Sequence, residues 1–288
     1  MTMTPDRRAF LRAATVAAIG GIGAASAVAP AHAATGRTTR GRNGVPRGAI
    51  SIQLYSLRSI MTDASTAEVV LETLAEMGFV KVEAAGTYGM TPTAFKAMLD
   101  RVGLRASSAH IGNLDPQAVA DEAGALGARF VNFPYAAYQT LDEWRALAAD
   151  LNPVGEACQA AGIRYGYHNH ALEFEVEENG VQAYDVLLTE TDDRVVHMQL
   201  DLYWAVTGGQ DPVEVFRRDP RRFLQFHVKD RDEAGFFADP GEGTIDFPSI
   251  FSEQRLSGVI EYIVENDQPA DPLEFARTGI DYLRDVRF

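Results

Sequence analysis

The chain of 288 residues contains a single cysteine, Cys158. One cysteine excludes an intramolecular disulfide framework and a cysteine-rich structural zinc site. Cys158 lies in a stretch with a helical pattern, and we interpret it as a small buried apolar residue, not a nucleophile. The chain also lacks a glycine-rich phosphate loop after its first predicted strand, which argues against an open nucleotide-binding sheet.

Basic residues are in the minority, because 26 Lys and Arg stand against 40 Asp and Glu, a net charge of −14. Phosphate groups are bound by basic surfaces, so an acidic chain of this kind is not expected to bind nucleic acid or an anionic membrane. A small neutral substrate is compatible with this charge. The composition carries no signal for a particular oligomeric state.

The N-terminal segment has the pattern of an export signal. Arg7 and Arg8 precede a weakly hydrophobic stretch rich in Ala and Gly (13–30), and Ala31-His32-Ala33 fits a cleavage site. This pattern resembles a twin-arginine signal, which directs folded proteins out of the cytoplasm. We therefore predict a signal peptide over 1–33, a flexible linker over 34–48, and a periplasmic or extracellular protein without stable membrane insertion after cleavage. An uncleaved anchor is disfavoured by the weak hydrophobicity.

From residue 50 onward, short β-branched runs alternate with longer amphipathic stretches. We predict strands near 50–55, 79–84, 105–110, 129–133, 163–169, 195–202, 223–229 and 259–265. We predict helices over 64–77, 91–102, 116–126, 141–161, 183–190, 212–219, 247–256 and 272–285. Strict alternation requires a parallel sheet covered by helices, and closing that sheet removes its edges. The fold class is therefore α/β, a single (β/α)8 TIM barrel over 49–288.

Four of these strands end in a residue that can bind a metal: His168, Asp201, His227 and Glu265. The C-terminal ends of barrel strands meet at one mouth, so we predict that these side chains hold one divalent metal ion. Two imidazoles and two carboxylates suit a transition metal with positions left open for a substrate carbonyl. His170 lies on the same strand face as His168, so either histidine could be the ligand while the other acts as an acid–base.

Further polar side chains are placed inward at the mouth by the alternation along each strand. Glu83 and His110 are predicted to bind substrate hydroxyl groups or to act as an acid–base. Lys229 could bind a substrate oxygen or form a salt bridge with Glu265 or Asp201. Below this polar layer we expect Ile and Gly side chains in the barrel interior.

The remaining notable residues receive simpler interpretations. Trp204 could stack on a sugar face or pack in the core. His197, early on its strand, is interpreted as structural, and Gly241-Glu242-Gly243 as a turn that orders a loop. The acidic run over 173–178 is interpreted as a solvated hairpin arm, not a calcium site.

Six ordered motifs resemble the xylose isomerase-like TIM barrels, which include sugar phosphate isomerases and epimerases. The motifs lie at 53–58, 167–170, 200–204, 227–230, 241–247 and 264–267. The resemblance implies a carbohydrate or keto-sugar substrate and a divalent metal, with Mn²⁺ expected and Co²⁺, Mg²⁺ and Zn²⁺ as alternatives. Ketose epimerases of the family bind metal through Glu, Asp, His and Glu, and Asp201, His227 and Glu265 match the last three of these.

The first of those four positions departs from the family pattern. Tyr-His-Asn-His stands where relatives carry a glutamate, so His168 or His170 would replace one of the two acid–base glutamates and Glu265 would remain as the other. The resemblance implies a sugar isomerase or epimerase that removes a proton next to a metal-bound carbonyl. The alternatives are a lyase or hydratase on 3-keto-glycosides or inosose-type keto-polyols, and a non-catalytic carbohydrate-binding barrel. A nuclease on the same barrel is disfavoured by the acidity.

Overall fold

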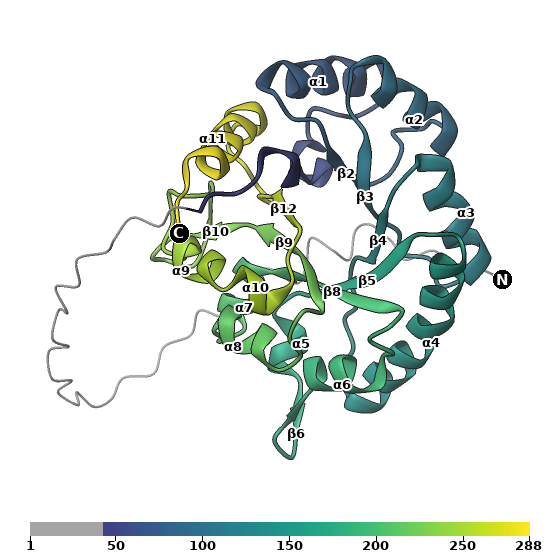
Figure 1. The fold of residues 1–288 in the computed structure, drawn as a ribbon, viewed down its shortest axis with the longest axis vertical. Coiled ribbons are helices and arrows are strands. Elements are labelled where there is room, and N and C mark those ends of the chain that lie inside the picture. Colours follow the sequence, from purple (N-terminus) through teal and green to yellow (C-terminus); the bar gives the residue numbers. More distant parts are fainter. Residues whose placement is uncertain (1–42) are drawn as a thin grey trace, which may run out of the picture. The chain divides into compact units, whose positions relative to one another are not determined.

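The computed structural model describes residues 43–288, so the predicted signal peptide and most of the predicted linker lie outside the described residues. The described chain forms an eight-stranded parallel sheet (Figure 1). The strands, in their order around the sheet, are β1 (Ile50–Ile52), β12 (Glu261–Val264), β9 (Phe223–Val228), β8 (Val196–Asp201), β5 (Arg164–His168), β4 (Phe130–Phe133), β3 (Ala106–His110) and β2 (Val82–Ala84).

The sheet nearly closes on itself. β1 pairs in parallel with β12, and a single bridge between Gln53 and Glu83 joins the end of β1 to β2. The side chains of the same two residues are also joined, because Gln53 Nε2 donates to Glu83 Oε1 at 2.8 Å. The predicted (β/α)8 TIM barrel is confirmed.

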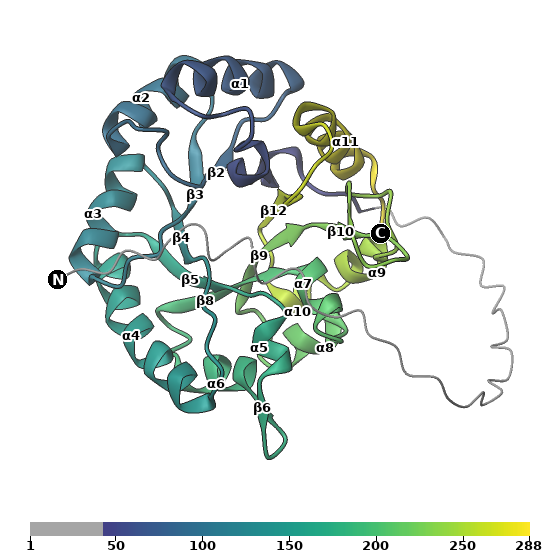
Figure 2. The same ribbon diagram turned by 180° about the vertical axis from the view of Figure 1, so that it is seen from behind.

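Helices surround the barrel, as both ribbon views show (Figures 1 and 2). They are α1 (Ala64–Met77), α2 (Pro92–Arg101), α3 (Pro116–Leu126), α4 (Leu141–Ala160), α6 (Ala183–Glu190), α8 (Pro212–Arg217), α9 (Phe247–Ser252), α10 (Gln254–Ser257) and α11 (Pro272–Asp285). The predicted helix over 247–256 is thus two shorter helices that meet at Glu253. Within residues 43–288, no helix has the length and apolar character needed to cross a membrane.

Local capping signals explain why several helix boundaries follow the sequence so closely. Asp63 and Thr66 form a capping box at the start of α1, and Gly78, with φ of 93°, ends that helix in the left-handed region. Thr140 and Glu143 form a second capping box at the start of α4. These interactions involve residues three apart, so they are visible in the sequence before any tertiary contact is known.

Short elements at the C-terminal ends of the strands build the mouth. They are the helices α5 (Leu172–Glu175) and α7 (Leu202–Thr207), the 3₁₀ helix η2 (Leu54–Leu57), and the hairpins β6 (Glu177–Glu178) with β7 (Val181–Gln182) and β10 (Asp230–Arg231) with β11 (Phe237–Ala238). In the second hairpin region, the backbone N–H groups of Gly241 and Gly243 donate to Asp230 Oδ2, which orders the loop as expected for a turn.

The acidic run over 173–178 is a solvated hairpin arm only in part, so that prediction was wrong at its first residue. Glu177 and Glu178 form the exposed strand β6, whereas Glu173 lies within α5 and is fully buried. Its two carboxylate oxygens accept hydrogen bonds from the Tyr167 hydroxyl at 2.6 Å and the His170 backbone N–H at 3.0 Å. A helical turn, which the alternation of a hairpin does not reveal, directs this side chain inward.

The barrel interior below the mouth contains Gly166 and Ile263, as expected, but polar side chains also continue down to the N-terminal ends of the strands. Near the N-terminal ends of the strands, buried Glu261 pairs with Lys81 Nζ at 3.0 Å and accepts hydrogen bonds from Ser107 and Gln225. Ile263 does face inward, but polar residues surround it. Most of these buried polar side chains hydrogen-bond to one another, which lowers the penalty of burying them, although Asn132 Oδ1 and His197 Nδ1 have no partner among the described residues.

Candidate active site

The four predicted ligand residues converge at the C-terminal end of the barrel. His168 ends β5, Asp201 ends β8, His227 lies near the end of β9, and Glu265 follows β12. One ligand atom from each side chain lies within 4.8 Å of the ligand atoms of the other three, and all four residues are buried. His170 is not part of this cluster, so the geometry selects His168 as the histidine of β5 that faces the other donors.

Asp201 is oriented by its position at the start of a helix. Its Oδ1 accepts a hydrogen bond from the Trp204 backbone N–H at 2.9 Å and so caps α7, while its own backbone N–H donates to Asn169 Oδ1 at 3.0 Å. These contacts direct Oδ2 into the cluster. Oδ2 is buried and forms an ion pair with Lys229 Nζ at 2.9 Å.

Both histidines of the cluster have their outer ring nitrogen held by a neighbour. His227 Nε2 lies 2.6 Å from Glu83 Oε1, and His168 Nδ1 lies 3.0 Å from Gln199 Oε1. The inner nitrogens therefore face the carboxylates of Glu265 and Asp201, at 2.5 Å and 3.8 Å respectively. Metal-binding histidines are usually held in this way by a second partner. Together with the carboxylates of Asp201 and Glu265, the two imidazoles form a donor set that fits a divalent cation.

Lys229 provides a positive charge inside the same cluster. Its buried Nζ lies 2.9 Å from an oxygen of each of Asp201, Glu265 and Asp267. Burial alone would lower the pKa of this ammonium group, but the three carboxylates outweigh burial and raise its pKa well above the usual value. The sequence left two interpretations of Lys229 open, as a ligand of a substrate oxygen or as a salt-bridge partner. The structure shows the salt bridges to Asp201 and Glu265.

The charge state of each histidine follows from its surroundings. Burial disfavours the charged form of His227, but Glu265 and Glu83 outweigh burial and raise the pKa of His227 to about 10. Burial, reinforced by the positive charge of Lys229, lowers the pKa of His170 to about 3. Burial and the neighbouring His227 also hold the pKa of His168 well below its usual value. His168 and His170 are therefore neutral near pH 7, while His227 must release a proton to bind a metal.

His170 lies beside the cluster at the mouth. Its ring packs against the rings of Tyr135 and Trp204, with centroids 5.0 Å and 5.2 Å away. Its backbone is held by Glu173, and its buried Nδ1 has no hydrogen-bond partner among the described residues. The imidazole of His170 is thus neutral and is held in position by its neighbours. Its Nδ1 atom makes no hydrogen bond with the described residues.

Glu83 and His110 occupy the layer just below the cluster. Glu83 is fully buried and accepts hydrogen bonds from Gln53, Ser108, Gln199 and His227. Burial opposes its ionisation, but His110 and His227 outweigh burial and hold the pKa of Glu83 well below its usual range. His110 Nε2 lies 2.7 Å from Gln199 Oε1 and 3.2 Å from Glu83 Oε1. Both residues therefore hold the cluster in place from beneath.

The aromatic and remaining predicted residues lie around this centre. Trp204 borders it, with Lys229 Nζ 5.5 Å from its ring centroid. Tyr203 donates its hydroxyl to the Gly235 carbonyl and so ties α7 to the hairpin loop. His197 is buried lower in the barrel, where its ring faces Gln225, as expected of a structural residue.

Three functional-site residues were missed in the sequence: Gln199 as a support for histidine, Asp267 as a partner of Lys229, and Glu173 as a support for His170. Asp267 could have been found, because it lies two residues after Glu265 and so follows the same alternation. Gln199 likewise shares the inward face of β8 with Asp201. Glu173 carried no such signal, since its inward direction depends on a single helical turn.

The comparisons with known proteins agree with this fold. The family described as xylose isomerase-like TIM barrel matches residues 71–286, and the chain belongs to this family. A crystal structure of a sugar phosphate isomerase/epimerase from Parabacteroides distasonis has 28% sequence identity and a TM-score of 0.69, and the match covers 89% of this chain and 98% of that one. The family resemblance deduced from the six motifs is confirmed.

The similar curated proteins carry the name inosose dehydratase. The one from Geobacillus kaustophilus is 28% identical over 272 residues, which covers 77% of this chain and 87% of that protein. The one from Clostridium botulinum is 31% identical over 169 residues, 50% of this chain. That match covers 55% of the relative, so the chain spans about half the length of several curated relatives it matches. A probable dehydratase from Bacillus anthracis, at 14% identity and a TM-score of 0.64, shares the fold.

Proposed function

We propose that the protein is a divalent-metal-dependent enzyme that removes a proton next to the carbonyl of a keto-sugar or keto-polyol and then eliminates a neighbouring oxygen substituent. The observation that carries this proposal is the neutral His170 with its unused Nδ1 beside the cluster of His168, Asp201, His227 and Glu265. The name of the similar curated proteins, inosose dehydratase, supports the elimination.

The four cluster residues would hold the metal, which when bound would polarise a substrate carbonyl. Neutral His168, the carboxylates of Asp201 and Glu265, and His227 after release of its proton supply the donors. Manganese is the ion we expect from the family resemblance, and the mixed nitrogen and oxygen donors are compatible with it. Lys229, through its ion pairs with Asp201 and Glu265, would keep the site from carrying an excess of negative charge.

His170 is proposed as the base. A neutral imidazole with an open nitrogen can accept a proton from the carbon next to the carbonyl. The electron pair of that C–H bond forms a C=C bond, and the C–O bond at the next carbon breaks. The resulting imidazolium of His170 returns the proton to the departing oxygen, so that water or an alcohol leaves. Proton and electrons are balanced without any further reactant.

Elimination is favoured over epimerisation by the state of Glu265. An epimerase of this family needs a second acid–base on the opposite face of the sugar, and Glu265 is the candidate for it. Both His227 and Lys229 already contact Glu265 Oε2, at 2.5 Å and 2.9 Å, and they hold the pKa of this carboxyl far below its usual value against the effect of burial. Glu265 is therefore a ligand and ion-pair partner with little basicity. A sugar isomerase or epimerase is the second candidate, supported by the 28% identity to the Parabacteroides protein.

The export pattern of residues 1–33 leads us to propose that this chemistry takes place outside the cytoplasm. Sugar phosphates are seldom available there, so the proposed substrates are free or glycosidic keto-sugars and keto-polyols. Residues 1–33 lie outside the described part of the structure, and the proposal rests on Arg7, Arg8 and the small residues at 31–33.

The test is incubation of the Mn²⁺-loaded protein with inosose and with a 3-keto-glucoside in D₂O, followed by NMR. Loss of water or release of the aglycone supports the lyase, whereas deuterium incorporation with every substituent retained supports the isomerase or epimerase. The variant His170→Gln is expected to lower the rate on the order of 100- to 10,000-fold, because it removes the proton acceptor.

His197→Gln is the matched control, since His197 is a buried histidine of the same barrel that lies away from the mouth. It is expected to retain the rate of the unmodified protein. A protein that binds the sugars but neither exchanges deuterium nor turns over would be the carbohydrate-binding barrel, and the proposed activity would be abandoned.

A further inference from the structure

Exposed arginines stand at the starts of successive strands. Arg105 and Arg129 directly precede β3 and β4, Arg164 opens β5, and Arg194 and Arg221 lie two residues before β8 and β9. The strands are parallel neighbours in one barrel, so these residues gather at its N-terminal end, opposite the candidate active site. Backbone hydrogen bonds place some side by side, because Arg164 N–H donates to the Arg129 carbonyl at 2.9 Å.

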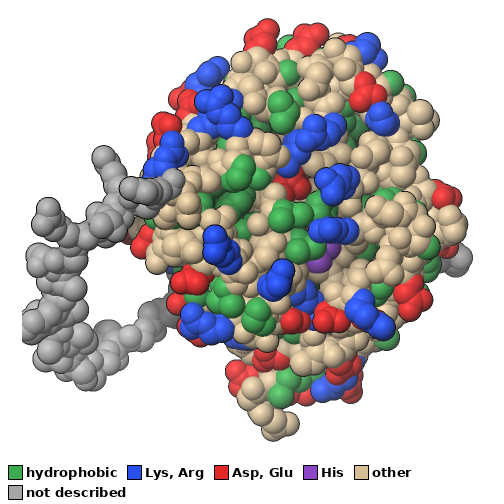
Figure 3. All heavy atoms as spheres, viewed as in Figure 1, with side chains coloured by type: hydrophobic (Ala, Val, Ile, Leu, Met, Phe, Trp, Pro, Cys, Tyr) green, Lys and Arg blue, Asp and Glu red, His purple; other side chains and the backbone are tan. Residues whose placement is uncertain are grey.

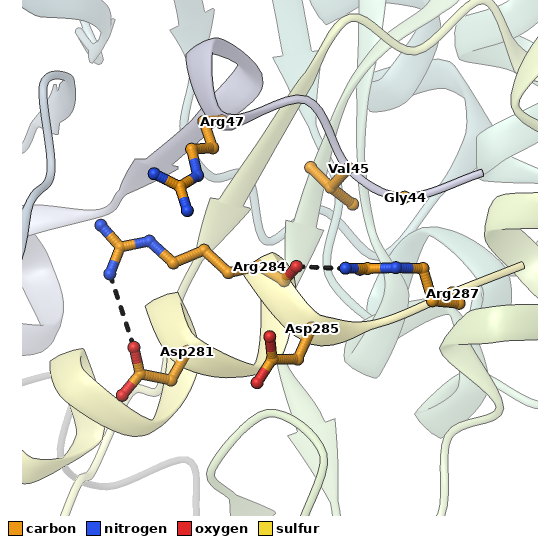
Figure 4. A pocket seen from close by; sticks show the side chains of 7 residues that line it. All are labelled: Gly44, Val45, Arg47, Asp281, Arg284, Asp285 and Arg287. Atoms are coloured by element: carbon orange, nitrogen blue, oxygen red, sulfur yellow. Dashed lines mark hydrogen bonds and ion pairs between the residues drawn. The ribbon is translucent and has the colours of Figure 1, made fainter. Parts of the chain in front are cut away.

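Further arginines extend this surface around two shallow hollows. One hollow, of about 460 Å³, is lined by Arg47, Arg284 and Arg287 together with two aspartates (Figure 4). The other, of about 860 Å³, is lined by Arg221 and Arg255. We call the whole surface the arginine face. It consists of the exposed residues Arg47, Arg105, Arg129, Arg164, Arg194, Arg221, Arg255 and Arg287.

Many of these charges are not used within the protein. Within residues 43–288, no ion pair or side-chain hydrogen bond involves the guanidinium groups of five of them: Arg47, Arg105, Arg129, Arg221 and Arg255. Among the exposed arginines elsewhere, Arg101, Arg145 and Arg217 each form an ion pair with a carboxylate. Unpaired like charges repel one another, so their accumulation on one face of an acidic protein does not stabilise the fold and points to an anionic partner.

Apolar side chains lie among the arginines. Val80 is 42% exposed and its carbonyl accepts from Arg105 N–H, while Ile260 is 47% exposed and precedes β12. Figure 3 shows Lys and Arg side chains spread over this face with hydrophobic patches between them. Basic residues combined with exposed aliphatic ones are typical of surfaces that bind an anionic bilayer, where the charges meet the headgroups and the apolar groups enter the interface.

The chain also enters the barrel at this face. Asn43 donates to the Phe288 carbonyl and lines the same hollow as Arg221 and Arg255. Asn43, the first described residue, therefore lies at the arginine face and not at the active-site end. A bilayer contacted by this face would leave the mouth open to dissolved substrate.

We propose that the arginine face docks on the surface of an anionic lipid bilayer. A bilayer is favoured over nucleic acid because the exposed large hydrophobic residues among the charges, Val80 and Ile260, are aliphatic and offer no ring for base stacking. The net charge of −14 argued against this partner from the sequence, but net charge is a sum and does not report how the charges are distributed.

The test is flotation of the full-length protein with vesicles of phosphatidylcholine, with and without phosphatidylglycerol. Replacing three unpaired arginines, Arg105→Gln, Arg129→Gln and Arg221→Gln, is expected to weaken binding to the anionic vesicles on the order of 100-fold. The matched variant Arg101→Gln, Arg145→Gln and Arg217→Gln changes the charge equally at paired positions and should bind as the unmodified protein does. Added salt should weaken binding, because it screens the charges.

The proposal is overturned if both triple variants bind equally, or if the protein binds neutral vesicles as well as anionic ones. It is also overturned if duplex DNA displaces the protein from the vesicles, or if the arginine-face variant only changes the oligomeric state in sedimentation experiments. Circular dichroism checks that each variant is folded, and the keto-sugar assay should be unchanged in both because neither triple variant touches the mouth.

Discussion

Glu173 is a buried carboxyl group without a neighbouring cation. Burial raises its pKa to about 7, even though hydrogen bonds from the Tyr167 hydroxyl and the His170 backbone N–H favour the ionised form. The same group holds the backbone of the proposed base. Ionisation of Glu173 therefore affects how the backbone of His170 is held. The position of Glu173 in an acidic run of the sequence did not suggest this role.

The pH dependence of stability is predicted to contain a contribution from Glu173. The carboxyl titrates at its ordinary pKa of 4.5 in the unfolded chain and at about 7 in the fold, so between these values the folded state binds more protons. The free energy of unfolding therefore falls as pH rises from about 4.5 to about 7, by roughly 3 kcal/mol. Glu173→Gln should remove this fall, which urea unfolding at a series of pH values measures.

Glu177→Gln serves as the control for that series. Glu177 lies exposed in β6, so its replacement should leave the slope of stability against pH unchanged. If the free energy of unfolding changes with pH in the same way for Glu173→Gln and for the unmodified protein, the pKa of Glu173 is not raised in the folded state.

At the scale of elements, strand β5 depends on a glycine. A Cβ atom at Gly166 would lie 2.5 Å from Asn132 Oδ1 and 2.6 Å from the His197 ring, both of which are buried. Glycine is usually unfavourable within a strand, so its presence here reflects the space that two large inward side chains require.

Gly166→Ala is predicted to lower the free energy of unfolding by about 1 to 3 kcal/mol, because the added methyl group must displace buried neighbours. Gly124→Ala is the matched control. A Cβ added at Gly124, in α3, would have no atom within 4 Å apart from its chain neighbours and the backbone of its own helix, so this variant should gain roughly 0.5 to 1 kcal/mol. Urea unfolding measures the free energy of unfolding of both variants. If that free energy is the same for Gly166→Ala as for the unmodified protein, the predicted clash with Asn132 and His197 does not occur.

The eight strands and the long helices were predictable because apolar runs and amphipathic stretches alternate regularly along the chain, so even the three-residue strands β1 and β2 occur at the expected spacing. The short elements were not. α5, α7 and the two hairpins span between two and six residues per segment, which is too few for a pattern to be recognised. The division at Glu253 was missed for a related reason, since α9 and α10 follow each other without a glycine or proline between them.

At the scale of the whole molecule, the candidate metal site joins four strands whose ligands extend from His168 to Glu265. The unfolded chain holds these donors far apart, so a bound ion stabilises the folded state alone. With Mn²⁺ at about 100 times its dissociation constant, the gain is about 2.7 kcal/mol, which raises the melting temperature by roughly 5 to 10 °C.

Thermal unfolding with EDTA and then with excess Mn²⁺ measures this gain. Asp201→Asn should abolish it, since the variant lacks a charged ligand, whereas Asp193→Asn should not, because Asp193 is exposed before β8 at the opposite end of the barrel. An equal rise in melting temperature for both variants would show that the ion binds elsewhere.

The sequence by itself determined the alternation of strands and helices, the barrel, and the four ligand-type residues at strand ends, because hydrophobic period and strand alternation are local properties. Only the tertiary structure decided that Lys229 lies between Asp201 and Glu265, that Glu173 supports His170, and that unpaired arginines form one face. These relations join residues from separate elements. Their distances depend on how the barrel closes, and a linear pattern does not contain that information.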